Sequence, residues 1–440
     1  MVQPRLYYPE DKLPLTQLLP MGMQHVVAMF GATVLAPILM GFNPQVALFF
    51  SGVGTLIFAF TTAFKVPSYL GSSFAFIGPV LAVTGGDSSR IPLALCGIAG
   101  AAVLYGLAGL ATMRWGSRWI DGLMPPVVTG TVVAIIGLNL AGSAVANCLN
   151  ADIAVRTSAD AVRLLISGLT FMTAAFVSIH LKGFLRLLPI LIGAVTGYAL
   201  SALLGALDPV AVDTVRVSPW LGLPPFQTPA WSGEALLAIA PIFVVLVAEN
   251  KGHLAAISGY LKRDLNPYLG RAYLGDAVAT LVSALGGGTP QTTYAENMGV
   301  MAITRVFSTW NFVVAACIAI LLGLCPKFGA LIQSIPSPVL GGITLILYGL
   351  IALMGVKIWI DAGVDFCSHK NLVVAGAPLI VATGMGVKGV TVGGVNIAGI
   401  ALGTVLAVAA HLLLSLGSGR GEPAQDHVLC KEHRKGEVSA

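Results

Sequence analysis

Long apolar stretches, separated by short polar or charged turns, follow one another along almost the whole chain. A helix that crosses a bilayer needs about 20 mostly apolar residues. We expect membrane segments at residues 22–41, 44–64, 68–85, 91–113, 124–148, 160–180, 185–206, 234–257, 271–287, 289–305, 309–325, 335–355, 371–388 and 394–416. The pattern predicts an all-α polytopic membrane protein with fourteen transmembrane segments.

The third and tenth segments are too polar or too short to be ordinary spanning helices. They contain VPSYLGSSFAFIGPV (66–80) and TPQTTYAENMGVMAITR (289–305), which are rich in Gly, Ser, Thr and Pro. Such residues indicate extended backbone, and this is tolerated at membrane depth only where it is buried in protein or lines a cavity. A half-helix that begins there offers free N–H groups to a polar ligand. We therefore expect a ligand site at these two broken segments.

The two halves of the chain show these features in the same order. In each half a helix with a histidine, QHVVAMFGATVLAP or VLVAENKGHLAAISG, is followed by one plain helix and then by a broken segment. Seven segments per half is an odd number, so the second copy is inverted in the membrane. Inverted repeats with discontinuous helices are typical of secondary transporters.

Composition supports a membrane protein, and charge predicts its orientation. The 440 residues are 56% hydrophobic and 10% charged, with a mean hydropathy of +0.87, whereas soluble domains carry about 25% charged residues. With the N-terminus inside, 18 of the 24 Lys and Arg residues fall on the cytoplasmic side, so both termini are predicted to be cytoplasmic. No signal peptide is recognisable. The net charge of +5 follows from topology, and no nucleic-acid partner is expected.

Two acids interrupt the apolar pattern where a charge is expensive. Glu249 ends a hydrophobic run, and Glu296 lies in the second broken segment. A carboxylate at membrane depth costs about 2.5–3.5 kcal/mol by insertion scales and usually marks a substrate or proton route. The alternatives are a structural pair of Glu249 with Lys251 or His253, and a capping role for Glu296 at the following half-helix.

Two histidines are candidates for proton coupling, and two further charged residues, Lys251 and Asp276, have roles that stay open. His253 lies four residues after Glu249 on the same helical face, so that its imidazole could hydrogen-bond the acid and share a proton. His25 is either a relay or a packing residue. Lys251 either extends to the cytoplasmic side or stabilises the charged acid. For Asp276, a packing or interfacial role is favoured over proton transfer.

Nothing in the sequence predicts an enzyme, a cofactor or a metal site. The six cysteines show no metal-ligand spacing, HExxH is absent, and so is the G-x-S-x-G nucleophile elbow. An intramembrane hydrolase that uses Glu249 and His253 is therefore disfavoured.

The second broken segment resembles the signature of the nucleobase–ascorbate transporter family, the nucleobase:cation symporters. In that signature an acid or Gln is followed by Asn-x-Gly-x4-Thr-Arg, and the matching residues here are Glu296, Asn297, Gly299, Thr304 and Arg305. The blocks QHVVAMFGATVLAP, VPSYLGSSFAFIGPV and AENKGHL also resemble family blocks, in the family's order, and the bacterial uracil permeases are the most similar members.

The resemblance implies two inverted repeats of seven segments, with short antiparallel strands in segments 3 and 10. It implies a core domain at residues 22–113 and 234–330 and a gate domain at 114–233 and 331–416. Residues 1–21 would be a cytoplasmic tail and 417–440 a disordered cytoplasmic tail. It further implies a homodimer in the bacterial inner membrane and alternating access between core and gate.

The implied cargo is uracil or a related nucleobase, imported by proton symport. The substrate-binding residues would be Glu249, Glu296, Phe74, Ala75, Tyr294, Ala295 and Ala32; the proton-coupling residues His253, Glu249 and His25; and the structural motif Ser73, Asn297, Gly299, Thr304 and Arg305. Uracil permeases carry Gly where this chain has Ala295. The alternative is a xanthine or uric acid permease, although an acid at position 296 favours uracil because purine transporters often have Gln there. Two acids would repel an inorganic anion.

Overall fold

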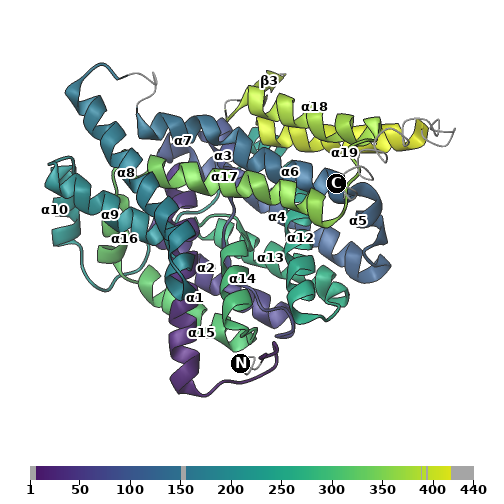
Figure 1. Ribbon diagram of the computed structural model, residues 1–440, viewed down its shortest axis with the longest axis horizontal. Coiled ribbons are helices and arrows are strands. Elements are labelled where there is room, and N and C mark those ends of the chain that lie inside the picture. The colour runs from purple at the N-terminus through teal and green to yellow at the C-terminus, as the bar shows by residue number, and fades with distance from the viewer. Residues whose placement is uncertain (1–5, 150–154, 388, 393–394, 418–440) are drawn as a thin grey trace, which may run out of the picture.

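The computed structural model describes residues 6–149, 155–387, 389–392 and 395–417, and these form one helical bundle (Figure 1). The predicted tail at 417–440 lies, except for Gly417, outside the described residues, as do residues 1–5. The first helix begins at Leu15 rather than at residue 22, so the predicted N-terminal tail is shorter than expected.

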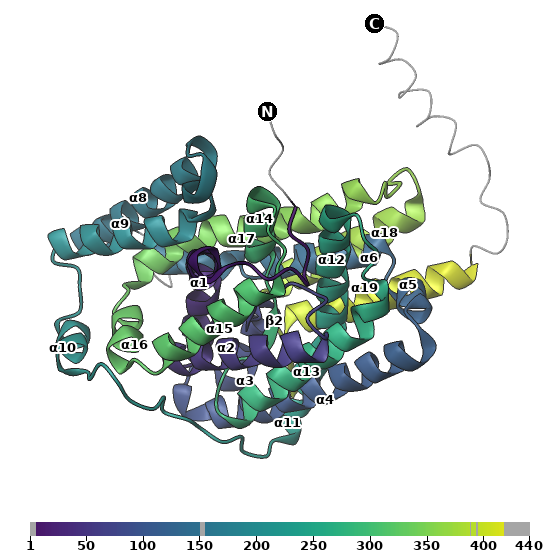
Figure 2. The same ribbon diagram turned by 90° about the horizontal axis from the view of Figure 1, so that it is seen from below.

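One group of packed elements comes from two distant parts of the chain. Helix α13 contacts α2 and α4, and α15 contacts α1 and α2, so the first and second halves interleave in the centre of the molecule (Figures 1 and 2). The helices and strands of this group are α1 (Leu15–Met40), α2 (Pro44–Thr61), β1 (Leu70–Ser72), α3 (Ile77–Thr84), α4 (Ile91–Trp115), α11 (Gly233–Ile239), α12 (Phe243–Leu261), α13 (Leu269–Leu285), β2 (Gln291–Thr293), α14 (Ala295–Thr304), α15 (Thr309–Gly323) and α16 (Pro326–Gln333).

The remaining elements form a second group. Helix α17 packs against α6, α7 and α8, and α18 packs against α6 and α19. Figure 1 shows α17 lying across α6 and α7, and α18 and α19 side by side. The elements are α5 (Arg118–Leu123), α6 (Pro126–Asn139), α7 (Ala141–Cys148), α8 (Ser158–His180), α9 (Pro189–Leu203), α10 (Pro209–Val217), α17 (Ser337–Asp361), α18 (His369–Met385), β3 (Val390–Val392), β4 (Val395–Ile397) and α19 (Gly399–Gly417).

In the described part of the chain, five short 3-10 turns connect these elements. They are η1 (Phe74–Phe76), η2 (Ser88–Arg90), η3 (Gly183–Leu187), η4 (Ala240–Ile242) and η5 (Asn266–Tyr268). The start of α2 illustrates how the sequence defines an element: the Asn43 side chain accepts the Gln45 N–H, and Pro44 occupies the first turn, where no N–H is needed.

Helix length bears on the number of spans. Within the described residues, seven helices are long and apolar enough to cross a membrane, or eight if α15 and α16, which are bent by 83° at their junction, form one span. Three shorter apolar helices lie at Phe74–Thr84, Pro189–Leu203 and Gly399–Ser415. Fourteen segments therefore remain a prediction.

The predicted segments at 234–257 and 124–148 are each confirmed as one candidate span, at Gly233–Leu261 and Pro126–Cys148. Within these spans the first is divided into α11, η4 and α12 at Pro241, where a backbone N–H is missing, and the second into α6 and α7. Helices α5, α10 and α16 lie where loops were predicted. The fold is not purely α-helical either, because β3 and β4 pair as an antiparallel hairpin between the last two helices.

Candidate functional site

The broken segments meet at a two-stranded antiparallel sheet, as the resemblance implied. Strand β1 pairs with β2 in the register Leu70 to Thr293 and Ser72 to Gln291. Each strand then leads into a half-helix, α3 after the turn at Phe74–Phe76 and α14 at Ala295. Since the strands run in opposite directions, the half-helices leave from opposite ends and both direct their N-termini at the sheet.

Two threonines on neighbouring helices complete the strand hydrogen bonds in the same way. The Leu70 N–H donates to Thr55 Oγ1 on α2 (2.9 Å), and the Gln291 N–H donates to Thr280 Oγ1 on α13 (3.0 Å). Leu70 and Gln291 are each the first residue of their strand. The first N–H of each strand is thus satisfied by protein, as non-helical backbone at this depth requires.

Tyr294 fastens β2 to β1. Its N–H donates to Tyr69 O (3.1 Å), and its hydroxyl donates to Ser72 O (3.0 Å). The ring crosses β1 at Gly71, where a Cβ atom would be 2.5 Å from the ring carbons. The side chain of Tyr294 is buried, and its hydroxyl links the end of β2 to β1.

The two predicted carboxyl groups converge beside β2. Glu249 lies on α12 next to Thr292, although the two side chains do not reach hydrogen-bond geometry, and Oε2 of Glu249 is buried without a partner. Glu296 lies in the first turn of α14 and interacts electrostatically with Glu249. Both side chains are partly accessible. An unpaired acceptor and a second acid thus adjoin the sheet from two different elements.

His253 has a different partner from the one predicted. Its Nδ1 shares a 2.8 Å hydrogen bond with Thr293 Oγ1 on β2, whereas the sequence predicted a bond to Glu249. The reason is that β2 runs along α12 and places a hydroxyl in front of the imidazole. Glu249 and His253 still share one face of α12 and border the same strand.

His25 is joined to the second broken segment rather than to an acid. Asn297 Nδ2 donates to both Nδ1 and the main-chain oxygen of His25, each at 3.1 Å. An amide donor at Nδ1 leaves the ring proton on Nε2 in the neutral form. The ring also packs on Phe312 at 4.4 Å, and Nε2 is buried without a partner. These contacts connect α1 to α14.

The first broken segment presents an aromatic ring to the second group of helices. The ring of Phe74 lies edge-on to Tyr348 of α17, with centroids 6.4 Å apart. Ala75 and Ala32 are buried, and Ala295 is partly accessible. Sequence reasoning missed Tyr348, because one Tyr in a long apolar helix carries no signal of its own.

Asp276 is fully buried in a polar cluster, which excludes the interfacial position considered from the sequence. Asn250 Nδ2 donates to Asp276 Oδ2 (2.5 Å) and to the Tyr105 hydroxyl (3.0 Å), and that hydroxyl lies 3.4 Å from the same Oδ2. Oδ1 has no partner. The cluster joins α4, α12 and α13. Because Asn250 directly follows Glu249 in the chain, the cluster lies behind the candidate site.

The end of α14 lies far from the sheet. Thr304 Oγ1 donates to Val300 O (2.8 Å), and Arg305 ends the helix in the left-handed conformation (φ 58°). The N-terminal segment is attached here, since the Tyr7 N–H donates to Arg305 O (3.0 Å).

Gly299 lies in the middle of α14 and Lys251 on α12, and both are partly accessible. Ser73 is buried, with its N–H donating to Pro290 O (2.9 Å).

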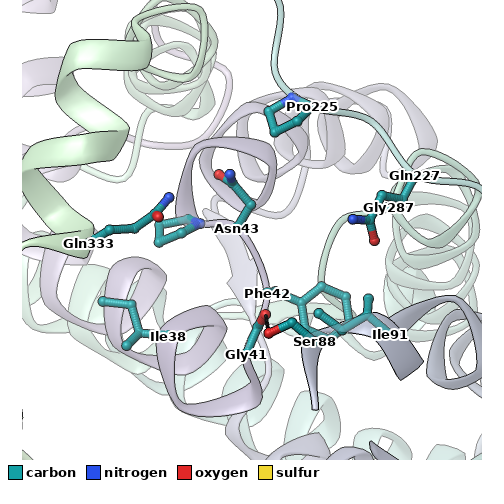
Figure 3. Close-up of a pocket in the computed structure, with 11 residues that line it drawn as sticks. Ile38, Gly41, Phe42, Asn43, Ser88, Ile91, Pro225, Gln227, Gly287 and Gln333 are labelled. Atoms are coloured by element: carbon teal, nitrogen blue, oxygen red, sulfur yellow. Dashed lines mark hydrogen bonds between the residues drawn. The ribbon is translucent and has the colours of Figure 1, made fainter. Parts of the chain in front are cut away.

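A pocket of about 390 Å³ lies elsewhere, beside the C-terminal end of α1 at Gly41 (Figure 3). None of the predicted site residues lines it. Asn43, Gln227 and Gln333 surround it together with the apolar Ile38 and Ile91. Among the described residues, no group of three or more His, Cys, Asp or Glu side chains could hold a metal ion.

Comparison with solved structures shows the fold. The transmembrane domain of a cyanobacterium bicarbonate transporter, BicA, matches with a TM-score of 0.61 at 17% identity, over 92% of this chain and 99% of that one. The murine anion transporter Slc26a9 in the inward-facing state matches with a TM-score of 0.68 at 11% identity, over 94% and 70%. The protein therefore has a membrane-transporter fold.

Sequence comparison shows the family. The model described as "Permease family" matches residues 16–392. The provisionally named pyrimidine permease RutG of Escherichia coli (strain K12) is 46% identical, over 92% of this chain and 91% of its own. The uracil permeases of Paenibacillus larvae and Escherichia coli (strain K12) are each 40% identical, over 94% and 92% of this chain and 97% and 93% of theirs. The chain is a multi-pass membrane protein and belongs to this permease family, the nucleobase–ascorbate transporter family.

Proposed function

We propose that the protein imports uracil or a closely related nucleobase across the bacterial inner membrane by proton symport. The observation that carries this proposal is the convergence of Glu249 and Glu296 beside the paired strands. The relatives named as uracil permeases, at 38–40% identity over most of the chain, support the same cargo.

The chemistry of the site favours a neutral ring with N–H donors. Carboxylates are acceptors, and the unpaired Oε2 of Glu249 offers a place for one donor. The N-terminal turns of α3 and α14 offer donors for ring carbonyls. Uracil presents both kinds of group along its edge. Two acids would repel an anion, although the solved structures with this fold include anion transporters.

The transport step is an alternating-access motion between two domains. The core would comprise 22–113 and 234–330, and the gate 114–233 and 331–416. The two packed groups of elements support this division, and Phe74 and Tyr348 would meet across it. Thr55 on α2 accepts the N–H of the first residue of β1, and Thr280 on α13 accepts the N–H of the first residue of β2. Because α2 and α13 would hold the same place in the two halves, these matching bonds support an inverted repeat.

Proton coupling would reside in Glu249 and His253, with His25 as an accessory group. Glu249 and His253 border the same strand from one face of α12, so a change in the charge of one acts on the other. Both termini would be cytoplasmic, and the protein would act as a homodimer. The N-terminal segment supports this orientation, since Lys65, Arg263 and Arg305 lie at the same end of the bundle.

Uptake of labelled uracil tests the proposal. We expect the wild-type protein to take up uracil in a manner abolished by a protonophore, and Glu249→Gln and Glu296→Ala to remove uptake while the protein remains in the membrane. Glu234→Gln is the matched control, because Glu234 is exposed at the start of α11. Full uptake in both site variants would refute the mechanism. Stronger competition by xanthine or uric acid than by uracil would assign a purine cargo.

A further inference from the structure

The connection from α10 to α11 is apolar and yet hardly buried. We call residues 209–231 the linker segment; it comprises α10 and the stretch that runs along the edge of the bundle to α11 (Figure 2). Its sequence, PVAVDTVRVSPWLGLPPFQTPAW, holds two charged residues, whereas about a quarter of the residues of a soluble protein are charged. Four of its large apolar side chains are between 76% and 83% exposed: Trp220, Leu221, Leu223 and Trp231.

Backbone hydrogen bonds fix the linker segment at the ends of three helices of the first group. The Gly222 N–H donates to Leu324 O after α15 (3.0 Å), the Gln227 N–H to Gly286 O after α13 (3.3 Å), and the Ala230 N–H to Pro92 O in the first turn of α4 (2.8 Å). Helix α4 is long and apolar enough to cross a membrane, so its start lies near one face of the bilayer. The linker segment therefore lies at the level of that face.

Helix α10 has an apolar stripe beside a charged one. Val210 and Val217 are seven residues apart, so they share a face, and they are 73% and 81% exposed. Asp213 and Arg216 form an ion pair beside this stripe (3.6 Å), and both side chains are exposed. No residue of α10 is buried. An amphipathic helix of this kind is suited to lie in the plane of a membrane surface.

A lysine from α16 holds the first tryptophan of the linker segment. Lys327 Nζ lies 5.1 Å from the centroid of the Trp220 ring and donates to Arg216 O (3.2 Å). Trp is enriched in the layer between acyl chains and water, because its ring is apolar and its N–H is polar. A Lys ammonium at the same level meets the anionic phosphates of the lipid headgroups. This pair of side chains favours lipid over protein as the neighbour of the linker segment.

We propose that the linker segment is a surface anchor that lies in the interfacial layer of the bilayer, at the face where α4 begins. Its exposed Trp and Leu side chains insert at the boundary between acyl chains and headgroups, and the Lys327 ammonium binds lipid phosphate. The anchor holds the connection between the two packed groups of helices at the membrane surface. It depends on the membrane-transporter fold and not on the proposed cargo.

Quenching of tryptophan fluorescence by brominated lipid tests this position. The purified full chain is placed in phosphatidylcholine nanodiscs whose acyl chains are unbrominated, brominated near the glycerol, or brominated near the methyl end. In chains that keep only Trp220 or only Trp231, with the other five Trp replaced by Phe, we expect a larger loss of emission from bromine near the glycerol than from bromine near the methyl end. A chain that keeps only Trp359 is the control and should be quenched less, because this ring packs on Phe366 and its Nε1 donates to Val127 O (3.0 Å).

A milder pair of variants gives the same answer if the chains with one Trp do not fold. Trp220→Phe/Trp231→Phe should lose more of the wild-type quenching by bromine near the glycerol than Trp310→Phe/Trp359→Phe, whose two rings are only partly accessible. Stronger quenching of Trp220 and Trp231 by aqueous iodide than by either lipid would place the linker segment in water and overturn the inference. Stronger quenching by bromine near the methyl end would place it among the acyl chains, and protection from all three quenchers would show that a second copy or another protein covers it; each result overturns the inference.

Discussion

The ring of Tyr294 lies across Gly71 so closely that no side chain fits between them. A Cβ atom at Gly71 would be 2.5 Å from two ring carbons and 2.6 Å from the hydroxyl oxygen. The hydroxyl donates to the neighbouring Ser72 O (3.0 Å). A residue of the second broken segment thus depends on a missing side chain in the first, and the proposed substrate site lies beside this contact.

The first prediction concerns this contact. We expect Gly71→Ala to lower the free energy of unfolding by about 1–3 kcal/mol, because the ring must leave its place over the strand, and to reduce uracil uptake. The measurement is the Tm of the purified protein together with uptake. Tyr294→Leu in the same chain should restore much of the Tm by removing the clash. An unchanged Tm in Gly71→Ala would contradict the packing described above.

The second prediction tests the threonines that brace the strands. Thr55→Val and Thr280→Val keep the side-chain shape but leave the Leu70 or Gln291 N–H without its acceptor, at a cost of about 1–3 kcal/mol each. We expect similar losses of Tm from the two variants. Thr196→Val is the control, since its hydroxyl bonds only to Ile192 O in its own helix. A loss confined to one variant would argue against equivalent roles.

The third prediction concerns the cluster behind Glu249. Asn250→Leu removes the donor that Asp276 Oδ2 receives and leaves a buried acid poorly partnered. We expect a loss of Tm that corresponds to about 1–3 kcal/mol, the cost of a buried acceptor that loses its donor. Adding Asp276→Leu should recover part of it, because the acid that needs the donor is then gone. Equal Tm values for the single and double variants would show that the two side chains are not coupled.

The fourth prediction concerns pH and the N-terminal segment. Glu10 forms salt bridges with Lys65, in the loop after α2 (2.9 Å), and with Arg263, after α12 (2.8 Å). Burial acts to raise the pKa of Glu10, but the hydrogen bonds from Lys65 and Arg263 outweigh it and lower the pKa below its usual value of 4.5. The charged form is therefore favoured by folding, so its contribution is present at neutral pH and is lost as the pH falls through the lowered pKa.

Glu10→Gln measures this contribution. We expect the variant to have a lower Tm than the wild-type protein at pH 7, by an amount that corresponds to at most about 1 kcal/mol per exposed pair. The difference should disappear at a pH below that lowered pKa, where Glu10 is protonated in both states. Glu234→Gln, at an exposed site, should show no such dependence. A difference that grows on acidification would reverse the sign and exclude this explanation.

The acids of the site and the broken segments could be predicted from the sequence, because polar residues in apolar runs are conspicuous. Glu249 and Glu296 stand out for this reason, and the residues around Ser72 and Thr292 signal extended backbone. The side chains that complete the site carry no such signal. Asn250 and Tyr348 acquire their roles from helices that meet only in the folded protein. The predicted partner of His253 was wrong for the same reason. Helical spacing predicted Glu249, but a strand from another segment places the Thr293 hydroxyl within hydrogen-bond distance of the imidazole.

The pairing of β1 with β2 also bears on how this chain enters the membrane. The hydroxyls of Ser72 and Thr289 lie 2.6 Å apart in space although 217 positions separate them along the chain. Strand β1 is synthesised long before β2, so its backbone N–H and C=O groups stay unpaired until β2 has been made. Neither half of the chain can form the central sheet alone, and a truncated protein that ends before β2 would have an incomplete core.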